Sequence, residues 1–227
     1  MTTSVPREPT VLRPHHENGA VTCVTAQILY VFHRQVPSMI EIDRAAAGSG
    51  EPNAGLSDAD AHFYLLRQGF KSVAISSYDM ERGQREGKSY LREYYGADCW
   101  GDEHEAYFTP EVLARNDEAD RAHLARMEPF LITGAARDVK KVATKQDVTE
   151  LLSSGHVIDA TLDENWPANR KKRVQPAVLL VPDMQSNGSM AWVFVPSRDG
   201  HECIWHFPLA EALDYVRYDR TVTGITL

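Results

Sequence analysis

One cysteine, Cys23, stands in the first part of an almost unbroken apolar stretch that runs from Gly19 to Phe32. Such a stretch predicts a helix that is buried on most sides, with Asn18 or Thr22 as its N-cap. A helix N-terminus carries unpaired N–H groups and about half a positive charge, which favours thiolate over thiol and can hold the oxyanion of an acyl transfer. Free cysteine is also among the most buried residue types. Cys23 is therefore either a reactive thiol that faces a cleft or a small core residue.

Two clusters of charged residues are further candidates for chemistry. The stretch 102–105 (Asp-Glu-His-Glu) places three carboxylates around one imidazole, a combination that suits a divalent metal. Its spacing matches no closed metal site and fits a solvated acidic loop. The stretch 170–173 (Arg-Lys-Lys-Arg) is a basic cluster in an acidic chain and fits a solvated loop between strands. Neither cluster leads us to expect a metal site.

Composition indicates one globular domain. The chain has 227 residues, of which 43% are apolar and 25% charged, close to ordinary globular usage. A chain of this length fits one core, because single cores stop growing near roughly 250 to 300 residues. The formal charge of −8 opposes binding to nucleic acid or anionic lipid, since both reward a basic surface. We therefore expect no nucleic-acid or membrane partner.

The sequence also bears on compartment and cofactors. No window approaches the run of about 18 apolar residues that a membrane span needs, and the Pro-rich start lacks the apolar region of a secretory signal. We therefore expect a soluble, cytoplasmic protein. Cys23, Cys99 and Cys203 make an odd count without C-x-x-C spacing, which argues against a disulfide framework and a zinc knuckle. There is no P-loop or dinucleotide glycine motif, so no cofactor is expected.

The order of predicted elements is that of an α+β domain. Residues 1–16, with three prolines and no apolar period, predict an extended or mobile tail that can dock on a single domain formed by 17–227. Capping signals and glycines predict helices over 38–46, 57–69, 78–95, 117–127, 144–152 and 209–216, and turn clusters bound strands at 73–75, 156–162, 177–181, 191–195, 202–207 and 221–225. The charged stretch 97–140 is a candidate lid or insertion. Helices first and strands afterwards favour a C-terminal antiparallel sheet.

Several stretches in collinear order carry a resemblance to a known family. They are Thr22-Cys23 to Gln27, Glu41-Ile42-Asp43-Arg44, Ala61 to Val73, Ile75 to Gly96 with its Ser-Tyr-Leu-Arg-Glu-Tyr-Tyr-Gly, and Leu151 to Leu162. In this order the chain resembles the papain-like cysteine peptidases, and most closely the stand-alone bacterial relatives of the peptidases that remove double-glycine leaders from bacteriocins. The resemblance spans most of residues 18 to 215. It implies a papain-like fold, with the nucleophile position at Cys23 on a helix start.

The resemblance also implies an oxyanion hole and a base, and the sequence departs from the family at both. A glutamine that precedes the cysteine in the family is replaced by the region of Glu17 and Asn18, where the Asn18 amide can donate the same hydrogen bond. The Gly-His pair that supplies the family's base is replaced by Gln175-Pro176. A thiol without a nearby imidazole is only a few per cent ionised at neutral pH, so peptide cleavage should be very slow.

Other histidines can take the place of the missing base only under special conditions. The family's Asp-Pro pair, whose acid orients the base, is replaced by Phe207-Pro208, directly after His206. His206 can approach the thiol only if the base has moved to an adjacent strand position, because strand neighbours point to opposite faces. His15 and His16 are either a solvated pair or, if the tail docks, neighbours of the thiol.

Two functions follow from the resemblance and its departures. The first is a pseudo-peptidase that binds a peptide, an amino-acid-like ligand or a protein partner in its cleft without efficient proteolysis. The second is a cysteine-dependent acyltransferase or amide hydrolase that acts through a thioester on Cys23, with Asn18 at the oxyanion and His206 as the base. Loss of both the base and its orienting acid favours the first, since together they supply several orders of magnitude in rate.

Overall fold

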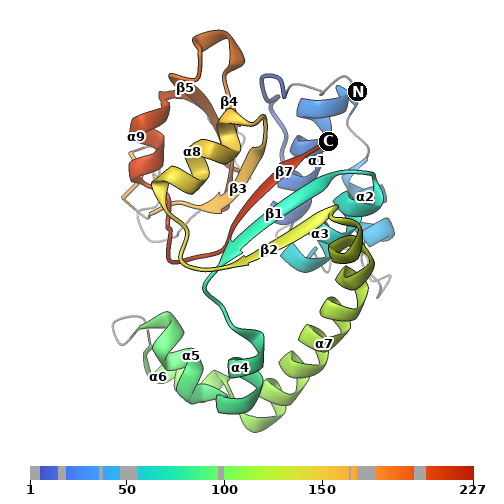
Figure 1. The fold of residues 1–227 in the computed structure, drawn as a ribbon, viewed down its shortest axis with the longest axis vertical. Helices are drawn as coiled ribbons and strands as arrows, with labels where there is room; N and C mark the ends of the chain where they lie inside the picture. The colour runs from blue at the N-terminus through green and yellow to red at the C-terminus, as the bar shows by residue number, and fades with distance from the viewer. Residues whose placement is uncertain are drawn as a thin grey trace.

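The computed structural model describes residues 6–14, 19–35, 38–46, 56–96, 100–163, 165–167, 177–196 and 203–227. The helices of these ranges are α1 (Ala20–His33), α2 (Met39–Ala46), α3 (Asp58–Arg67), α4 (Met80–Glu86), α5 (Lys88–Tyr95), α6 (Asp102–Tyr107), α7 (Pro110–Thr133), α8 (Lys145–Ser153) and α9 (Leu209–Asp214), with a short 3-10 helix at Met184–Ser186. The strands are β1 (Lys71–Ser76), β2 (Ala136–Lys140), β3 (Val157–Thr161), β4 (Ala177–Pro182), β5 (Met190–Phe194), β6 (Ile204–Pro208) and β7 (Val222–Thr226). The chain is α+β, as predicted (Figure 1).

The strands form one mixed sheet in the order β2-β1-β7-β3-β4-β5-β6. β1 and β2 are parallel, and every other pairing is antiparallel. The expected antiparallel, C-terminal sheet is thus present in most of its pairings, and the expectation fails at the β1–β2 edge. Parallel neighbours need a crossover connection, and here the chain between β1 and β2 supplies it through α4, α5, α6 and α7. β7, the last strand, lies between β1 and β3 and joins the early strands to the late ones.

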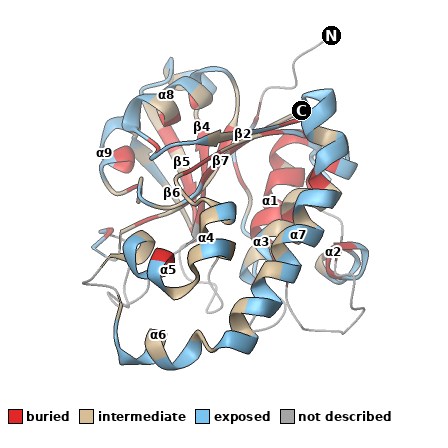
Figure 2. Ribbon diagram, turned by 60° about the horizontal axis from the view of Figure 1, so that its bottom comes forward, coloured by how far each residue is buried: buried red, intermediate tan, exposed pale blue. Residues whose placement is uncertain are grey.

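Helices cover both faces of the sheet. Alternate residues of β4 enter different cores: Leu179 and Val181 pack with α1 and α3, whereas Val178 and Leu180 pack with α8 and α9. A strand that is covered on both faces reads as a continuous apolar run, which explains the Val-Leu-Leu-Val sequence. Figure 2 shows that burial is concentrated in α1 and the central strands, while α7 and α4 to α6 are mostly exposed or half-buried.

Side-chain caps fix several helix starts where the sequence predicts them. Ser57 Oγ accepts from the N–H of Asp60 at 3.1 Å, and Thr144 caps α8 with Asp147 in a reciprocal capping box. The predicted helix over 78–95 is instead two helices. Gly87 interrupts the helix with φ +56° and ψ −129°, a backbone conformation that residues with a Cβ rarely adopt.

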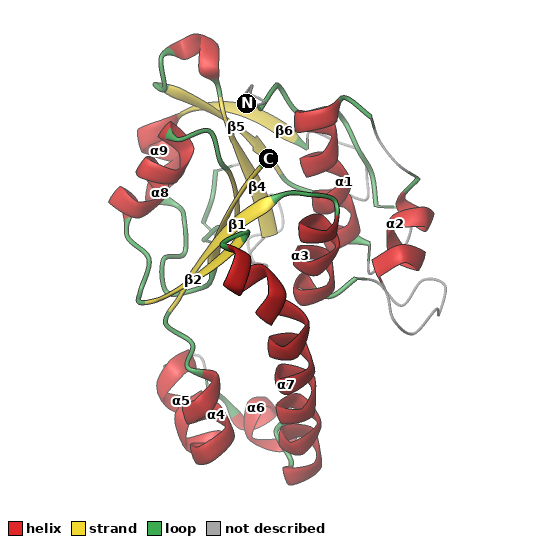
Figure 3. Ribbon diagram, turned by 45° about the vertical axis from the view of Figure 1, so that its right-hand side comes forward, coloured by secondary structure: helices red, strands yellow, loops and turns green. Residues whose placement is uncertain are grey.

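The crossover between β1 and β2 is a helical arm. In Figures 1 and 3, α4, α5 and α6 project away from the sheet, and α7 returns alongside α3 to β2. α7 contains the predicted helix over 117–127 but is much longer, because Thr109 caps it and Pro110 stands in its first turn. The arm begins directly after β1, before the stretch 97–140 that the sequence indicates, and β2 belongs to the sheet. No helix in the described ranges combines the length and apolar character needed to cross a bilayer.

The N-terminal segment 6–14 has no regular secondary structure and docks on α1, as the sequence allows. The N–H of Arg7 donates to the carbonyl oxygen of Val31 at 3.0 Å. Gln27 is fully buried on α1, and its side-chain amide forms two hydrogen bonds with the main chain of Thr10. Nε2 donates to the Thr10 carbonyl oxygen at 2.9 Å, and Oε1 accepts from the Thr10 N–H at 2.8 Å. The segment is thus held by bonds to its backbone.

Candidate functional site

Cys23 lies inside the first turn of α1 and not at its start. The helix has Gly19 as its N-cap, without a side-chain cap, and Thr22, one of the two expected caps, lies inside the helix. The N–H of Cys23 already donates to the carbonyl oxygen of Gly19 at 2.9 Å. The unpaired N–H groups of the helix belong to residues before Cys23, so the thiol stands at the end of the first turn and not among those groups.

The Cys23 thiol is a core group. Its exposed fraction is 0%, and it packs with Leu179 and Phe194 between α1 and the sheet. Burial raises the pKa of the thiol to about 12, and the nearby Cys203, also buried, adds to the effect. With that pKa, on the order of one thiol in 10⁵ is ionised at pH 7. The surroundings of Cys23 therefore suppress the thiolate.

The predicted partners of Cys23 do not assemble around it in the described chain. His206 is exposed on β6, where its Nε2 lies 3.0 Å from Asp183 Oδ2 and its ring stacks on Trp192 with centroids 4.1 Å apart. These contacts hold the imidazole on the edge strand β6, beside the connection between β4 and β5, and neither involves Cys23. Asn18, together with the histidines at 15–16, falls outside the described residues.

A row of seven residues crosses the sheet in register on one face. In the order β2, β1, β7, β3, β4, β5 and β6, the row is Asp138, Ala74, Thr223, Asp159, Leu179, Phe194 and Ile204. Paired residues share a face, and this face is the one that α1 and α3 cover, because Leu179 and Phe194 belong to their core. The row is apolar under α1 and mainly polar from Asp159 to Asp138. The polar half marks a different environment within the same face.

Asp159 lies in this polar half, and the carboxyl group of Asp58 is close enough to act on it electrostatically. Asp159 is half-buried on β3; burial raises its pKa from 3.8 to about 7, and the charge of Asp58 adds to the effect. Asp58 is the first residue of α3, and the surrounding protein raises its pKa although the residue keeps exposed surface. Carboxyl groups with perturbed pKa values and accessible surface are typical of binding and catalytic sites.

Asp120 on α7 is a third carboxyl group of this kind. Burial raises its pKa, and the charge of Asp117 adds to the effect. Asp60, two residues after Asp58 on α3, makes an ion pair instead: its Oδ1 lies 2.7 Å from Nη1 of Arg126. We call Asp58, Asp120 and Asp159 the unpaired carboxylates, because within the described chain their pKa values are raised and none of them makes an ion pair.

Two imidazoles, His62 of α3 and His123 of α7, lie close to each other and to Asp138 of β2. His62 stands one turn after Asp58 on the same face of α3, and its Nε2 is 2.5 Å from Ser72 Oγ on β1. Burial, together with the nearby His123, lowers the pKa of His62 to about 4. Burial also lowers the pKa of His123, whose buried Nδ1 has no hydrogen-bond partner in the described structure. Both imidazoles are neutral at pH 7.

The arrangement does not amount to a metal centre. In the residues that the structure describes, no three His, Cys, Asp or Glu side chains are placed to hold a metal ion. The stretch 102–105 forms most of α6, and its Glu105 binds Lys88, Arg92 and Trp100 of the arm. This carboxylate is thus a structural link between α5 and α6.

Comparisons with protein-family models, with curated proteins and with solved structures find no match for this chain. The site therefore rests on its own geometry. Sequence reasoning missed Asp159, although a signal was present: it is the one charged residue in the apolar strand Val-Ile-Asp-Ala-Thr. A carboxylate in the middle of a covered strand is rarely a packing residue.

Proposed function

We propose that this chain is a degenerate papain-like domain that binds an amine-bearing ligand, either a peptide N-terminus or an amino-acid-like molecule, without proteolysis through Cys23. The packing of a buried N-terminal helix against a mostly antiparallel sheet supports the papain-like part of the proposal. The burial of Cys23 and the separate contacts of His206 support the loss of thiol chemistry.

The observation that carries the proposal is that Asp58 and Asp159 lie near each other and that neither makes an ion pair in the described structure. An ionised carboxylate that lacks a cation and is surrounded by protein is costly, and a bound ammonium group would supply the missing charge. The neutral imidazole of His62 adds no competing positive charge beside Asp58. A peptide N-terminus or a free amino acid carries such an ammonium group.

The proposal implies a definite pH dependence. A cation binds the ionised form of Asp159, and with a pKa of about 7 this form rises from about one tenth at pH 6 to about nine tenths at pH 8. The affinity for an amine should therefore rise about tenfold over that range, with proton release on binding. A ligand bound through neutral groups would show no such rise.

The competing function, acyl transfer through a thioester on Cys23, has less support. Its nucleophile must be ionised and reachable, whereas the thiol is fully buried and has a pKa of about 12. It would also need a base from outside the described residues.

The test is retention of peptides in equilibrium dialysis at pH 8. The probes are a random hexapeptide library with free amino termini and the same library after N-acetylation, each analysed by mass spectrometry. We expect the protein to retain members of the free library but not their acetylated forms. Asp159→Asn should abolish this preference, and Cys23→Ala should keep it.

Three results would overturn the proposal. Retention of neither library would remove the binding function. Equal retention of free and acetylated peptides, or a preference that survives Asp159→Asn, would remove the carboxylate as its basis. Cleavage of the peptides that disappears in Cys23→Ala would establish the thiol enzyme instead.

A further inference from the structure

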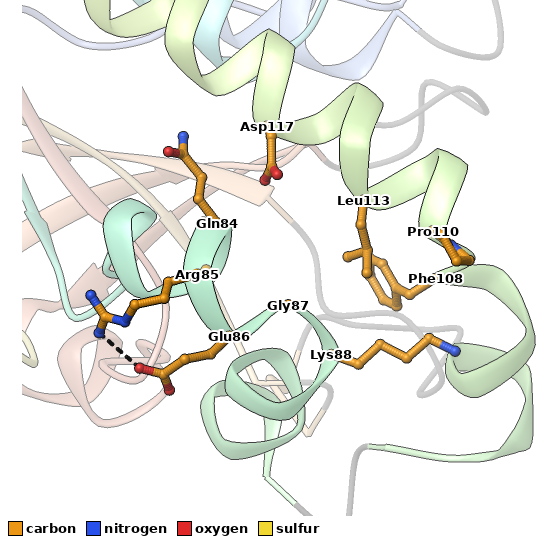
Figure 4. Close-up of a pocket in the computed structure, with 10 residues that line it drawn as sticks. Gln84, Arg85, Glu86, Gly87, Lys88, Phe108, Pro110, Leu113 and Asp117 are labelled. Atoms are coloured by element: carbon orange, nitrogen blue, oxygen red, sulfur yellow. Dashed lines mark hydrogen bonds and ion pairs between the residues drawn. The ribbon is translucent and has the colours of Figure 1, made fainter.

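The helical arm contains a pocket of its own, of about 390 Å³, between the α4–α5 junction and the first turns of α7. Side chains and backbone from both sides line it, including Gln84, Gly87, Phe108, Pro110, Leu113 and Asp117 (Figure 4). Its volume lies within the roughly 300 to 1,000 Å³ typical of small-molecule sites. The pocket is far along the chain from Asp159 and shares no residue with the unpaired carboxylates.

One side of the pocket is apolar. Phe108 and Leu113 lie next to each other in Figure 4, with Pro110 beyond them. The opposite side is formed by backbone where α4 gives way to α5, because Gly87 has no side chain to fill the space. A Cβ at Gly87 would stand 3.6 Å from Leu113 Cδ1, an ordinary van der Waals distance. The glycine therefore leaves this part of the pocket free of side-chain atoms.

The polar end of the pocket is negative. Asp117 and Gln84 lie at this end in Figure 4, and Asp117 makes no ion pair in the described structure. Asp120, one turn further along α7, is also without a cation, and burial together with the Asp117 charge raises its pKa. Burial raises the pKa of nearby Tyr78 to about 12, and the charges of Asp120 and Asp117 contribute.

The two cations that line the pocket are already engaged by other carboxylates. Arg85 turns toward Glu86, with Nη2 and Oε1 2.9 Å apart (Figure 4). Lys88 donates its Nζ to the carbonyl oxygen of Glu105 at 2.7 Å and approaches the carboxylate of the same residue at 3.2 Å. The charge at Asp117 is therefore left for a ligand to neutralise.

We propose that this pocket binds an arylalkylamine, a small molecule whose ring packs on Phe108 and Leu113 while its ammonium group pairs with Asp117. The apolar wall and the negative end call for these two parts in one ligand. The ring needs a flat apolar contact, and the amine needs to reach a carboxylate beside it. This inference is independent of the proposed function, because neither Asp58 nor Asp159 contributes to the pocket.

The test is calorimetric titration of the full chain with tryptamine and, separately, with indole-3-propionate, which has the same ring and the opposite charge. We expect saturable binding of tryptamine and at least about tenfold weaker binding of the acid, equivalent to about 1.4 kcal/mol. Asp117→Asn should weaken tryptamine binding several-fold. Asp102→Asn, an exposed carboxylate change on α6 with the same effect on net charge, should leave it unchanged.

Two further variants keep the result interpretable. Leu113→Ala removes part of the apolar side of the pocket and should weaken the binding of both ligands. Asp159→Asn should leave tryptamine binding unchanged. Equal affinity for the amine and the acid would overturn the proposal, as would an unchanged affinity in Asp117→Asn or the absence of saturable tryptamine binding. Loss of binding in Asp159→Asn with retention in Asp117→Asn would place the amine at the sheet instead.

Discussion

Replacing Asp159 with asparagine should stabilise the protein above neutral pH and leave its stability nearly unchanged in acid. The folded-state pKa of Asp159 is about 7, against an ordinary value of 3.8. Between about pH 4 and pH 7 the folded state holds a proton that the unfolded chain releases, so the contribution of Asp159 to stability falls as pH rises through this window. About three pH units at about 1.4 kcal/mol each set an upper limit of about 4 kcal/mol above pH 7. Asparagine has the same shape and never ionises.

The assay is urea unfolding of wild type and Asp159→Asn at pH 4.5, 6 and 8. We expect a difference in the free energy of unfolding that is small at pH 4.5, grows at pH 6 and reaches a few kcal/mol in favour of the variant at pH 8. Asp102→Asn, which changes the net charge equally at an exposed position, controls for general charge effects. A difference that is constant with pH, or one that favours wild type at pH 8, would refute the raised pKa and with it the site.

Two other substitutions test the packing that surrounds Cys23. Thr22→Val removes the buried hydroxyl that donates to the Asp43 carboxylate between α1 and α2, and should lower the free energy of unfolding by about 1–3 kcal/mol in urea titrations; an unchanged value would show that this bond is not formed. Gln27→Ala removes both bonds to the main chain of Thr10, and should make segment 6–14 several-fold more susceptible to limited proteolysis at pH 8 while the rest of the chain stays resistant; equal cleavage rates would contradict the docked arrangement.

The sequence predicts the local structure well where short-range signals determine it. Ser57 and Thr144 cap helices because their hydroxyl oxygens accept from the backbone N–H three residues later, and the apolar strands of the last third appear close to the expected bounds. β2 was not predicted, because its Ala-Arg-Asp-Val-Lys sequence is that of an exposed edge strand with little apolar periodicity. Its place in the sheet depends on pairing with β1, which is not a local property.

The candidate site was harder to predict than the fold. Whether Cys23 is reactive depends on its place within the first helical turn, and capping by Gly19 without a side-chain bond has no clear sequence signature. Asp159 becomes notable only when the sheet places it opposite Thr223 and brings Asp58 from α3 close to it. Such long-range juxtaposition comes from topology, and no periodicity in the sequence reports it.

The most direct test of the central claim, that this domain does not act through a thiolate, is the pH dependence of Cys23 alkylation by iodoacetamide in the Cys99→Ser, Cys203→Ser background. A fully buried thiol with a pKa of about 12 should remain unlabelled from pH 6 to 9 in the folded protein and react fully once urea unfolds it. Rapid labelling of the folded protein with a midpoint well below pH 8 would contradict the account and restore Cys23 as a nucleophile.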